Sequence, residues 1–376
     1  MAEQYEWLTD GMAPTYGMEL TQRLRQDPRV KLSFDGLESA ANRRWMETLL
    51  ANHRAGLWHV PLVCDATHAT HGASASSDFV PVVTAHRRFV AGEYAMLQVP
   101  GQPRRAEVVR IDSVDPAGLI LADLLAADWP AGSEVVPTVR ARLDAMPQLD
   151  RFTSDAAPYS VTFQASDLLE LAAGFGAPEH RELPVFEQPT YWTTDPTYTP
   201  ERQVAAIDDG IGPVMLYDQA GMTLPRISVE VTAIGAAEIA AHRAFVAALA
   251  GRHHPLWVPS FGQDLALLAV NSPTSIDVEW SGLSDWPLRS NRRDIRIGRF
   301  SGAPVYRRIT SAMAVDDNVE RLVLDSALPS GFAAADVADI SFMALCRQDA
   351  DVNSLRLWRS GVVQSQMTFV GCQHGL

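Results

Sequence analysis

Four residues within one short segment are of the types that bind metal ions. They are His59, Cys64, His68 and His71, and imidazole nitrogen and thiolate sulfur are donors that zinc and other transition metals prefer. The spacing His68-x-x-His71 could direct two ligands toward one ion from a turn. The matching stretch later in the chain, 257–264, has no counterpart to either histidine. We therefore expect a polar exposed loop here, with no metal and no other cofactor.

The sequence contains no motif of a known nucleophile, metalloprotease or phosphate-binding loop. Gly-x-Ser-x-Gly, His-Glu-x-x-His and Gly-x-x-x-x-Gly-Lys are all missing. The adjacent carboxylates 208–209 and 316–317 could serve as the acid and base of a glycosidase. Each pair is followed by a turn-forming residue, glycine or asparagine, so solvated turns account for them better. We expect no catalytic residues and no enzyme.

Charge and composition exclude several classes of partner. The formal net charge is −14, which disfavours a protein that grips phosphates. The one local basic cluster is Arg289, Arg292, Arg293, Arg296 and Arg299. We interpret it as a salt-bridge surface between subunits and expect no sequence-specific nucleic acid. No stretch approaches the roughly 18 apolar residues of a membrane span, so no membrane partner is expected. The three scattered cysteines fit production in a reducing cytoplasm.

The elements that position these residues occur twice along the chain. Residues 28–34 and 225–231 both predict a β-strand that begins after a proline. A helix follows each strand, at about 39–54 and about 236–250, with apolar residues at helical spacing and a glycine just beyond its end. Trp45, Met46, Leu49 and Leu50 form the apolar face of the first helix, and Phe245, Val246 and Leu249 form that of the second.

Further matches keep the same order in both halves of the sequence. They are Leu57–Pro61 with Leu256–Pro259, Arg110–Ser113 with Arg308–Ser311, Gly118–Leu121 with Arg321–Leu324, Pro130–Gly132 with Pro329–Gly331, and Tyr159–Phe163 with Ser365–Phe369. Short strands between turn residues, with one helix, predict a small β-sandwich or barrel with the helix packed on one side. We expect a mainly β fold with α (α+β), made of two duplicated modules. The predicted divisions are an N-terminal arm (1–27), a first module (28–167), a proline- and aromatic-rich connecting arm (168–224) and a second module (225–376).

A further set of short phrases occurs along most of the chain. They are Glu6–Asp10, Tyr16–Glu19, Leu24–Arg29, the Leu-Trp phrase with its following proline after each helix (Leu57–Pro61 and Leu256–Pro259), and Phe152–Asp155 ahead of Val161–Phe163. These phrases resemble those of tail-tip and baseplate proteins of bacteriophages with long non-contractile tails. The resemblance implies tail-tube-like modules that form a ring around the DNA path, as a trimer or a hexamer. It also implies a virion tail location after synthesis in the host cytoplasm, with other tail proteins (tube, hub, fibre or spike) as partners.

Two other functions remain open from the residues alone. The aromatic arm from Phe186 to Tyr198 could stack on sugars, which would make the chain a carbohydrate-binding or carbohydrate-cleaving tail protein. The segment from His59 to His71 could support a metal-dependent hydrolase. We expect a structural virion protein ahead of both.

Overall fold

In the computed structural model the chain is mainly β with two α-helices, α1 (Ala40–His53) and α2 (Gly235–Leu249). The structure describes residues 1–12, 20–53, 56–145, 147, 153, 156–167, 169, 171–188, 195–286, 288, 292–359 and 361–372. Within these ranges no helix has the length and apolar character needed to cross a membrane. The predicted residues Tyr16–Glu19, Phe152, Tyr191, Trp192 and Arg289 lie outside the described part of the chain. The expected fold class, mainly β with some α, is present.

The remaining elements are β-strands and two short 3-10 helices, η1 and η3. The first half contains β1 (Ala2–Glu6), β2 (Thr9–Met12), β3 (Leu20–Arg23), β4 (Arg29–Ser39), β5 (Trp58–Pro61), η1 (Val63–Asp65), β6 (Thr67–His68), β7 (Phe79–Val80), β8 (Tyr94–Val99), β9 (Gln102–Asp115), β10 (Gly118–Leu121), β11 (Glu134–Leu143) and β12 (Ala156–Ala165). The rest of the chain contains β13 (Glu179–His180), β14 (Leu183–Pro184), β15 (Thr197–Ile207), β16 (Met215–Ile234), β17 (Leu256–Pro259), β18 (Leu267–Ser272), β19 (Ser275–Glu279), β20 (Asp294–Arg299), β21 (Val305–Asp316), β22 (Val319–Leu324), η3 (Ala334–Asp336), β23 (Val337–Gln348), β24 (Val352–Arg359) and β25 (Val362–Gly371).

The strands of the first half pair in a simple order. β4 pairs with β12, β12 continues onto the end of β11, and β11 pairs with both β5 and β8. From β8 the ladder continues through β9 and β10 to β7. All of these pairs are antiparallel, and α1 connects β4 to β5.

The second half repeats this order of pairings. β16 pairs with β25, β25 pairs with the end of β23, and β23 pairs with both β17 and β20. The ladder then continues through β21 and β22 to β19, and β18 adds one further strand. Helix α2 connects β16 to β17, as α1 connects β4 to β5.

Individual contacts also occupy matching places in the two halves. In each half a hydroxyl pair joins the first long strand to the last. On the first long strand, two residues before the hydroxyl group, a cation forms an ion pair with an aspartate. The backbone N–H of this aspartate donates to the backbone carbonyl oxygen of the threonine in the hydroxyl pair. The hydroxyl pairs are Ser33–Thr162 at 3.0 Å and Ser228–Thr368 at 2.9 Å, and the ion pairs are Lys31–Asp144 and Arg226–Asp349.

The predicted alignment of the two first strands is wrong by two residues. It set Ser33 against Glu230, whereas the hydroxyl pairs and the strand registers match Ser33 to Ser228. Because side chains alternate between the faces of a sheet, a shift of two leaves every residue on its predicted face. The apolar pattern therefore could not reveal the error.

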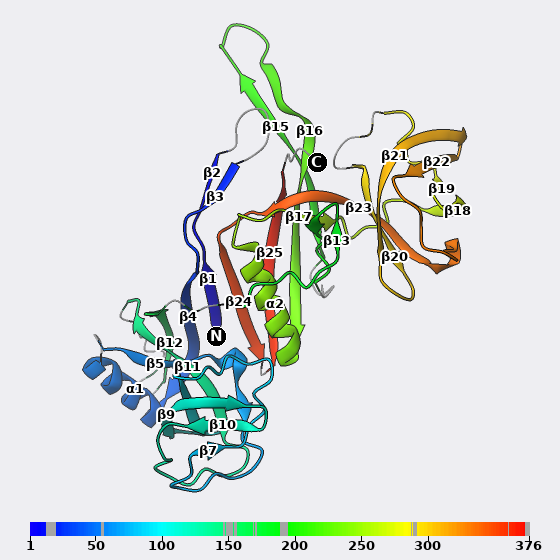
Figure 1. The fold of residues 1–376 in the computed structure, drawn as a ribbon. Helices are drawn as coiled ribbons and strands as arrows, with labels where there is room; N and C mark the ends of the chain where they lie inside the picture. Colours follow the sequence, from blue (N-terminus) through cyan, green and yellow to red (C-terminus); the bar gives the residue numbers. More distant parts are fainter. Residues whose placement is uncertain are drawn as a thin grey trace.

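Each half begins with a β-hairpin that leads into its first long strand. β1 lies against β4 with Ala2 opposite Ser33, and β15 lies against β16 with Thr197 opposite Ser228. Farther out, Thr9 is opposite Arg23 in the first hairpin, and Val204 is opposite Asp218 in the second. The second hairpin projects well beyond the rest of the chain in Figure 1. The segments predicted as arms thus contain paired strands in the same register.

The two halves share one central sheet because β1 pairs with β24 as well as with β4. The resulting strand order is β12–β4–β1–β24–β25–β16–β15. Helix α2 lies across one face of this sheet (Figure 1). Side chains of both halves fill the core beneath it, including Tyr5, Trp7, Leu32, Phe245 and Phe369. Burial of each such side chain stabilises the fold by roughly 1.5–3 kcal/mol, so this core fixes the halves to each other.

The two helices lie within one residue of the predicted ends that the structure describes. The predicted face of the second helix is buried, whereas that of the first is buried only in part, since Leu50 is 6% exposed and Met46 and Leu49 are half-buried. Phe245 on α2 is fully buried, whereas Trp45 on α1 is 42% exposed. The prediction that Trp45 faces the core is wrong. Gly251 follows α2 with φ +68°, and a Cβ there would lie 2.4 Å from Asp351 Oδ1. That position requires glycine for its backbone conformation and for its close approach to the neighbouring turn.

Candidate functional site

The predicted metal segment does not bring its ligands together. Cys64 is buried in η1, and burial raises the pKa of its thiol. His59 contacts the Tyr94 ring in a tilted arrangement with ring centroids 4.5 Å apart, and burial lowers the pKa of His59. His68 and His71 are exposed. Among the described residues there is no group of three or more His, Cys, Asp or Glu side chains placed to hold a metal ion.

The paired carboxylates lie in hairpin turns. Asp208 accepts a hydrogen bond from Gly210 N at 2.9 Å, and Asp316 accepts one from Asn318 N at 2.8 Å. Asp209 accepts from two backbone N–H groups, and these bonds lower the pKa of its carboxyl. Asp208, Asp209 and Asp316 therefore order the turns in which they lie.

Of the aromatic arm, the structure describes Phe186 and Tyr198, and Phe186 lies in the interior of the second half. Phe186 is 1% exposed and packs edge-on against Phe245, Phe261 and Phe369 at centroid distances of 5.6, 6.0 and 5.1 Å. A ring buried on several sides cannot stack on a sugar. Tyr198 remains half-buried at the edge of the sheet.

The described arginines of the predicted basic cluster have partners inside the chain. Arg296 contacts Glu187 at 2.6 Å and Asp339 at 3.1 Å. Arg293 donates to a backbone carbonyl, and Arg299 lies over an aromatic ring. Arg292 lies over Phe342, 4.8 Å from the ring centroid. These contacts spread the guanidinium groups over several elements, so they do not form one phosphate-binding patch.

A buried ionic cluster joins the two halves around β1. Arg88 Nη2 lies 2.9 and 2.8 Å from the two carboxylate oxygens of Glu3, and Arg88 Nε lies 2.6 Å from Asp65 Oδ2. From the second half, Arg243 on α2 donates to Asp65 Oδ1 at 3.2 Å. Tyr5 donates to Glu3 at 2.6 Å and accepts from Arg88. The carboxylates of Glu3 and Asp65 are 0% and 2% exposed.

Charge pairing keeps Glu3 ionised inside this cluster. Burial by itself would raise the pKa of Glu3, but the charges of Arg88 and Arg243 and the hydrogen bond from Tyr5 outweigh it and lower the pKa to about 2. Burial raises the pKa of Tyr5, so its phenol stays neutral and able to donate. Removing one member of such a cluster leaves an uncompensated buried charge. The cluster therefore fixes β1, the first half and α2 in one arrangement.

The matching place in the second half is an open pocket. Tyr198 on β15 occupies the position that Glu3 occupies on β1, since each lies opposite a matched residue of the next strand. With Asp264, Trp286 and Arg292 it lines a pocket of about 460 Å³. Arg292 Nη1 lies 4.0 Å from Asp264 Oδ1, and the Arg292 side chain is 48% exposed. A helix covers this place in the first half, and no described element covers it in the second.

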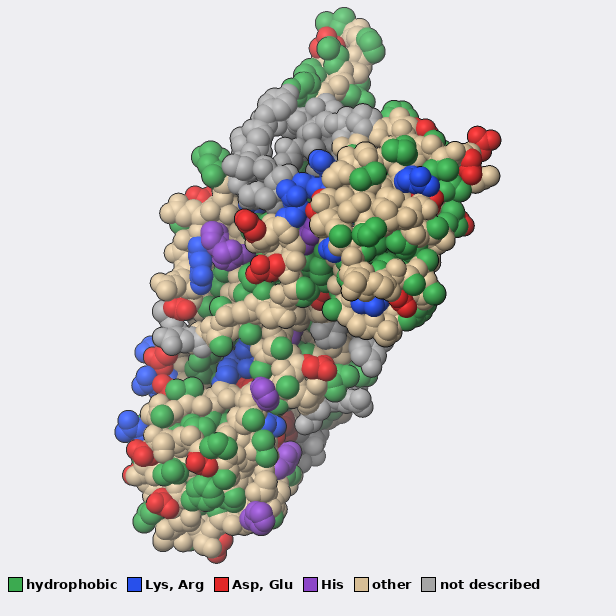
Figure 2. Space-filling model, turned by 45° about the vertical axis from the view of Figure 1, so that its right-hand side comes forward, with side chains coloured by type: hydrophobic (Ala, Val, Ile, Leu, Met, Phe, Trp, Pro, Cys, Tyr) green, Lys and Arg blue, Asp and Glu red, His purple; other side chains and the backbone are tan. Residues whose placement is uncertain are grey.

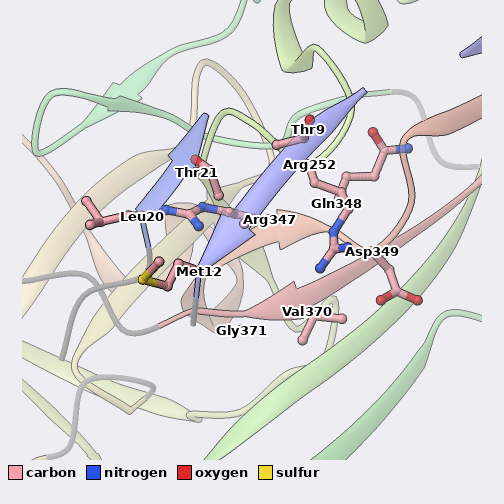
Figure 3. A pocket seen from close by; sticks show the side chains of 11 residues that line it. Thr9, Met12, Leu20, Thr21, Arg252, Arg347, Gln348, Asp349, Val370 and Gly371 are labelled. Atoms are coloured by element: carbon pink, nitrogen blue, oxygen red, sulfur yellow. The ribbon is translucent and has the colours of Figure 1, made fainter. Parts of the chain in front are cut away.

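The first hairpin rests on the end of the second half (Figure 3). Thr9 N donates to Asp351 Oδ2 at 2.8 Å, and Thr21 Oγ1 donates to the carbonyl of His253 at 3.3 Å. A cavity of about 120 Å³ remains between β2–β3 and the ends of β23 and β25, with Arg252 and Arg347 among its lining residues. This cavity is small, and the contact around it is polar. The cavity and the contact therefore belong to the interface between the two halves.

The second hairpin exposes its apolar side chains. Ile211 is 95% exposed at its tip, and Ile207, Met215 and Leu216 are 60%, 69% and 71% exposed. Figure 2 shows hydrophobic side chains along this projection. Contiguous exposed apolar residues mark surfaces that bind another protein. The hairpin is therefore a candidate docking element.

The face of the central sheet opposite α2 is polar. Because successive side chains of a strand point to opposite faces, the residues that alternate with the buried core residues point to this open face. They include the hydroxyl and amide residues Gln4, Ser33, Ser160, Thr162, Gln164, Ser228, Ser354, Gln364, Gln366 and Thr368. Charged side chains of both signs lie among them, namely Lys31, Asp35, Glu230 and Arg356. Such a face can border water or a charged polymer without gripping either one.

The ionic cluster and the pocket were missed from the sequence because their members are distant along the chain. A glutamate alternating with Tyr5 and Trp7 on an inward-facing strand was the one available signal for Glu3. No protein-family model matches the chain, and a search of curated proteins finds no relative.

Proposed function

We propose that this chain is a non-enzymatic, ring-forming subunit of a bacteriophage tail tip, built from two copies of one tail-tube-like module. The observation that carries the proposal is the repeated order of strand pairings. Both halves have the same order of antiparallel pairings, with a helix at the same point. Matched hydroxyl pairs and ion pairs link the first and last long strands of each. Independent folds do not share registers at this level of detail, so duplication is the simplest source.

The limits of the proposed module differ from those expected from the sequence. Because the hairpins β1–β3 and β15–β16 pair in the same register, each copy begins with its hairpin. The first copy then starts near residue 2 and the second near residue 197. Only the stretch before 197 connects them, and its described part packs on α2 through Phe186.

A ring places the two faces of the central sheet in different surroundings. The face with α2 is covered by helix and core, and the open face carries hydroxyl and amide side chains together with charged side chains of both signs. We assign the open face to the lumen, where charges of opposite sign offset one another and the polar wall lets DNA pass without adhering to it. The exposed apolar hairpin supports contact with a neighbouring tail protein, and the virion tail is its expected location.

Imaging and mass measurement test this proposal. We expect purified protein to form closed particles with a central opening in negative-stain micrographs, with a mass of a small whole number of chains in sedimentation. Labelled antibody should also decorate one end of intact tails. A protein that stays monomeric at every concentration and is missing from purified virions would contradict the proposal. A glycan array serves as the control for a carbohydrate-binding role, since Tyr198 and Trp286 both line the open pocket.

A further inference from the structure

We propose that the open pocket on the second half is the docking site for helix α1 of a second copy of this chain. The inference rests on the proposed ring-forming function and names the contact that closes the ring. Its template is inside the molecule, where α2 of the second half covers η1 of the first. There Arg243 reaches Asp65, and the surrounding side chains are buried.

The pocket is the second-half version of the surface that α2 covers. Tyr198 takes the place of Glu3 on the matched strand. Asp264 and Arg292 form a carboxylate–guanidinium pair, as Asp65 and Arg88 do. The pair in the first half is 2% and 14% exposed at its side chains, whereas the pair in the second half is 21% and 48% exposed. The same kind of surface is covered in one half and open in the other.

Helix α1 has the complementary lack of cover. Trp45 is 42% exposed, and Leu37 and Leu57, on either side of the helix, are 65% and 52% exposed. These exposed apolar side chains lie on α1 and on the segments that precede and follow it in the sequence. α1 also contains two cations: Arg43, which is 8% exposed and lies 2.7 Å from Glu47, and Arg44, which is exposed. The apolar and cationic character of α1 matches an aromatic pocket with a carboxylate.

The positions of the two surfaces allow a head-to-tail contact. α1 packs near β12, at one end of the central strand order, and the pocket lies beside β15, at the other end. A surface that binds a different surface on an identical copy generates a ring when the rotation closes. The edge of β15 that faces away from β16 has no strand partner among the residues described, while the matching edge of β1 pairs with β24. Because this contact uses both halves of each chain, it favours the trimer over the hexamer.

Substitution of Trp45 tests the contact directly. We expect Trp45→Glu to weaken trimer formation at least 30-fold in sedimentation experiments, the size of effect seen for a central aromatic residue of an interface. Trp286→Glu should have a similar effect from the opposite side. Leu124→Glu is the matched control, because Leu124 is also a large apolar residue of the first half, 62% exposed, and should leave the trimer intact. Circular dichroism of each variant checks that the fold is kept.

Cross-linking distinguishes this contact from other ways of making a trimer. With a short bis-maleimide reagent, the double variant Trp45→Cys, Trp286→Cys should give covalent species up to three chains. A mixture of the two single variants should stop at two chains. The native Cys64, Cys346 and Cys372 are buried, so wild type is the background control. A wild-type trimer that survives Trp45→Glu and does not cross-link would overturn the docking site alone. A wild-type protein that is always monomeric would overturn both the docking site and the ring.

Discussion

Helices α1 and α2 each connect the first long strand of their half to the next strand, yet they are buried to different degrees. Phe245 on α2 has no exposed surface, because the segment around Phe186 and the first half both pack on it. Trp45 on α1 is 42% exposed. Burial of an element in this protein thus depends on which neighbour it has. A surface left open in one half can be interpreted by what covers its counterpart in the other.

The same contrast holds for the charged groups. Glu3, Asp65 and Arg88 are enclosed by β1 and α2, and the pairing among them is close. Asp264 and Arg292 are 4.0 Å apart at the rim of a pocket. A buried ion pair matters more to the stability of the fold than an exposed one, because a buried charge that loses its partner destabilises the folded state.

The largest expected effect separates the two helices. Phe245→Ala should lower the free energy of unfolding by about 3–5 kcal/mol, because it leaves a cavity in the central core. Trp45→Ala should cost less than about 1 kcal/mol in dilute protein, with a larger loss only at concentrations that support the ring. Urea unfolding at two protein concentrations measures both. Equal losses in dilute protein would show that α1 is buried as deeply as α2.

The ionic pairs should differ almost as strongly. Arg88→Ala leaves the buried Glu3 without its ion-pair partner and Asp65 with Arg243 alone, and should cost about 3–5 kcal/mol. Arg292→Ala removes a half-exposed group and should cost less than about 1 kcal/mol. Guanidinium chloride would screen these charges, so urea is the suitable denaturant. A large loss for Arg292→Ala would mean that its pocket is not open in solution.

The depressed pKa of Glu3 predicts a dependence of stability on pH. Its carboxyl has a pKa of about 2 in the folded protein and an ordinary value near 4.5 when unfolded, so the stabilisation is fully present above pH 4.5. It is lost as the pH falls from about 4.5 toward 2, by up to about 3 kcal/mol. Glu3→Gln should flatten this part of the curve. The same slope in wild type and in Glu3→Gln would mean that other carboxyls are responsible.

The smallest expected effect concerns the matched hydroxyl pairs. Thr162→Val and Thr368→Val each remove one hydrogen bond of the same kind from the same place in the wiring. Each should cost about 0.5–1.5 kcal/mol, and the two costs should agree. Thermal unfolding of the two variants measures them side by side. Losses that differ severalfold would indicate that the two positions are not equivalent.

Local features were the part of the fold that the sequence predicted. The helices lie close to their expected positions, and the matched strands from Gly118 and Arg321 pair in corresponding registers, because apolar spacing and turn residues determine both. The hairpins at the start of each half were not recognised. Their registers agree while residue types differ, as Trp7 and Arg202 do at matched positions. Hydrogen bonds of the backbone set a register, and these leave little trace in residue identity.

The candidate surfaces could not be predicted for a different reason. Glu3, Arg88 and Arg243 meet only because β1 inserts between the halves, and pairing across such distances has no local signal. The histidines that drew attention in the sequence lie on short exposed strands and loops, where His68 and His71 point to solvent. Residue type alone could not show which groups converge.

The insertion of β1 between β4 and β24 has a consequence for how the protein acquires its structure. Ala2 lies opposite Arg356, so β1 cannot complete its pairing until the distant strand β24 has formed. Until then, the inward side chains Tyr5 and Trp7 lack half of their enclosure. Contacts between such distant segments form slowly, and we expect β1 to lock in place in the final kinetic phase.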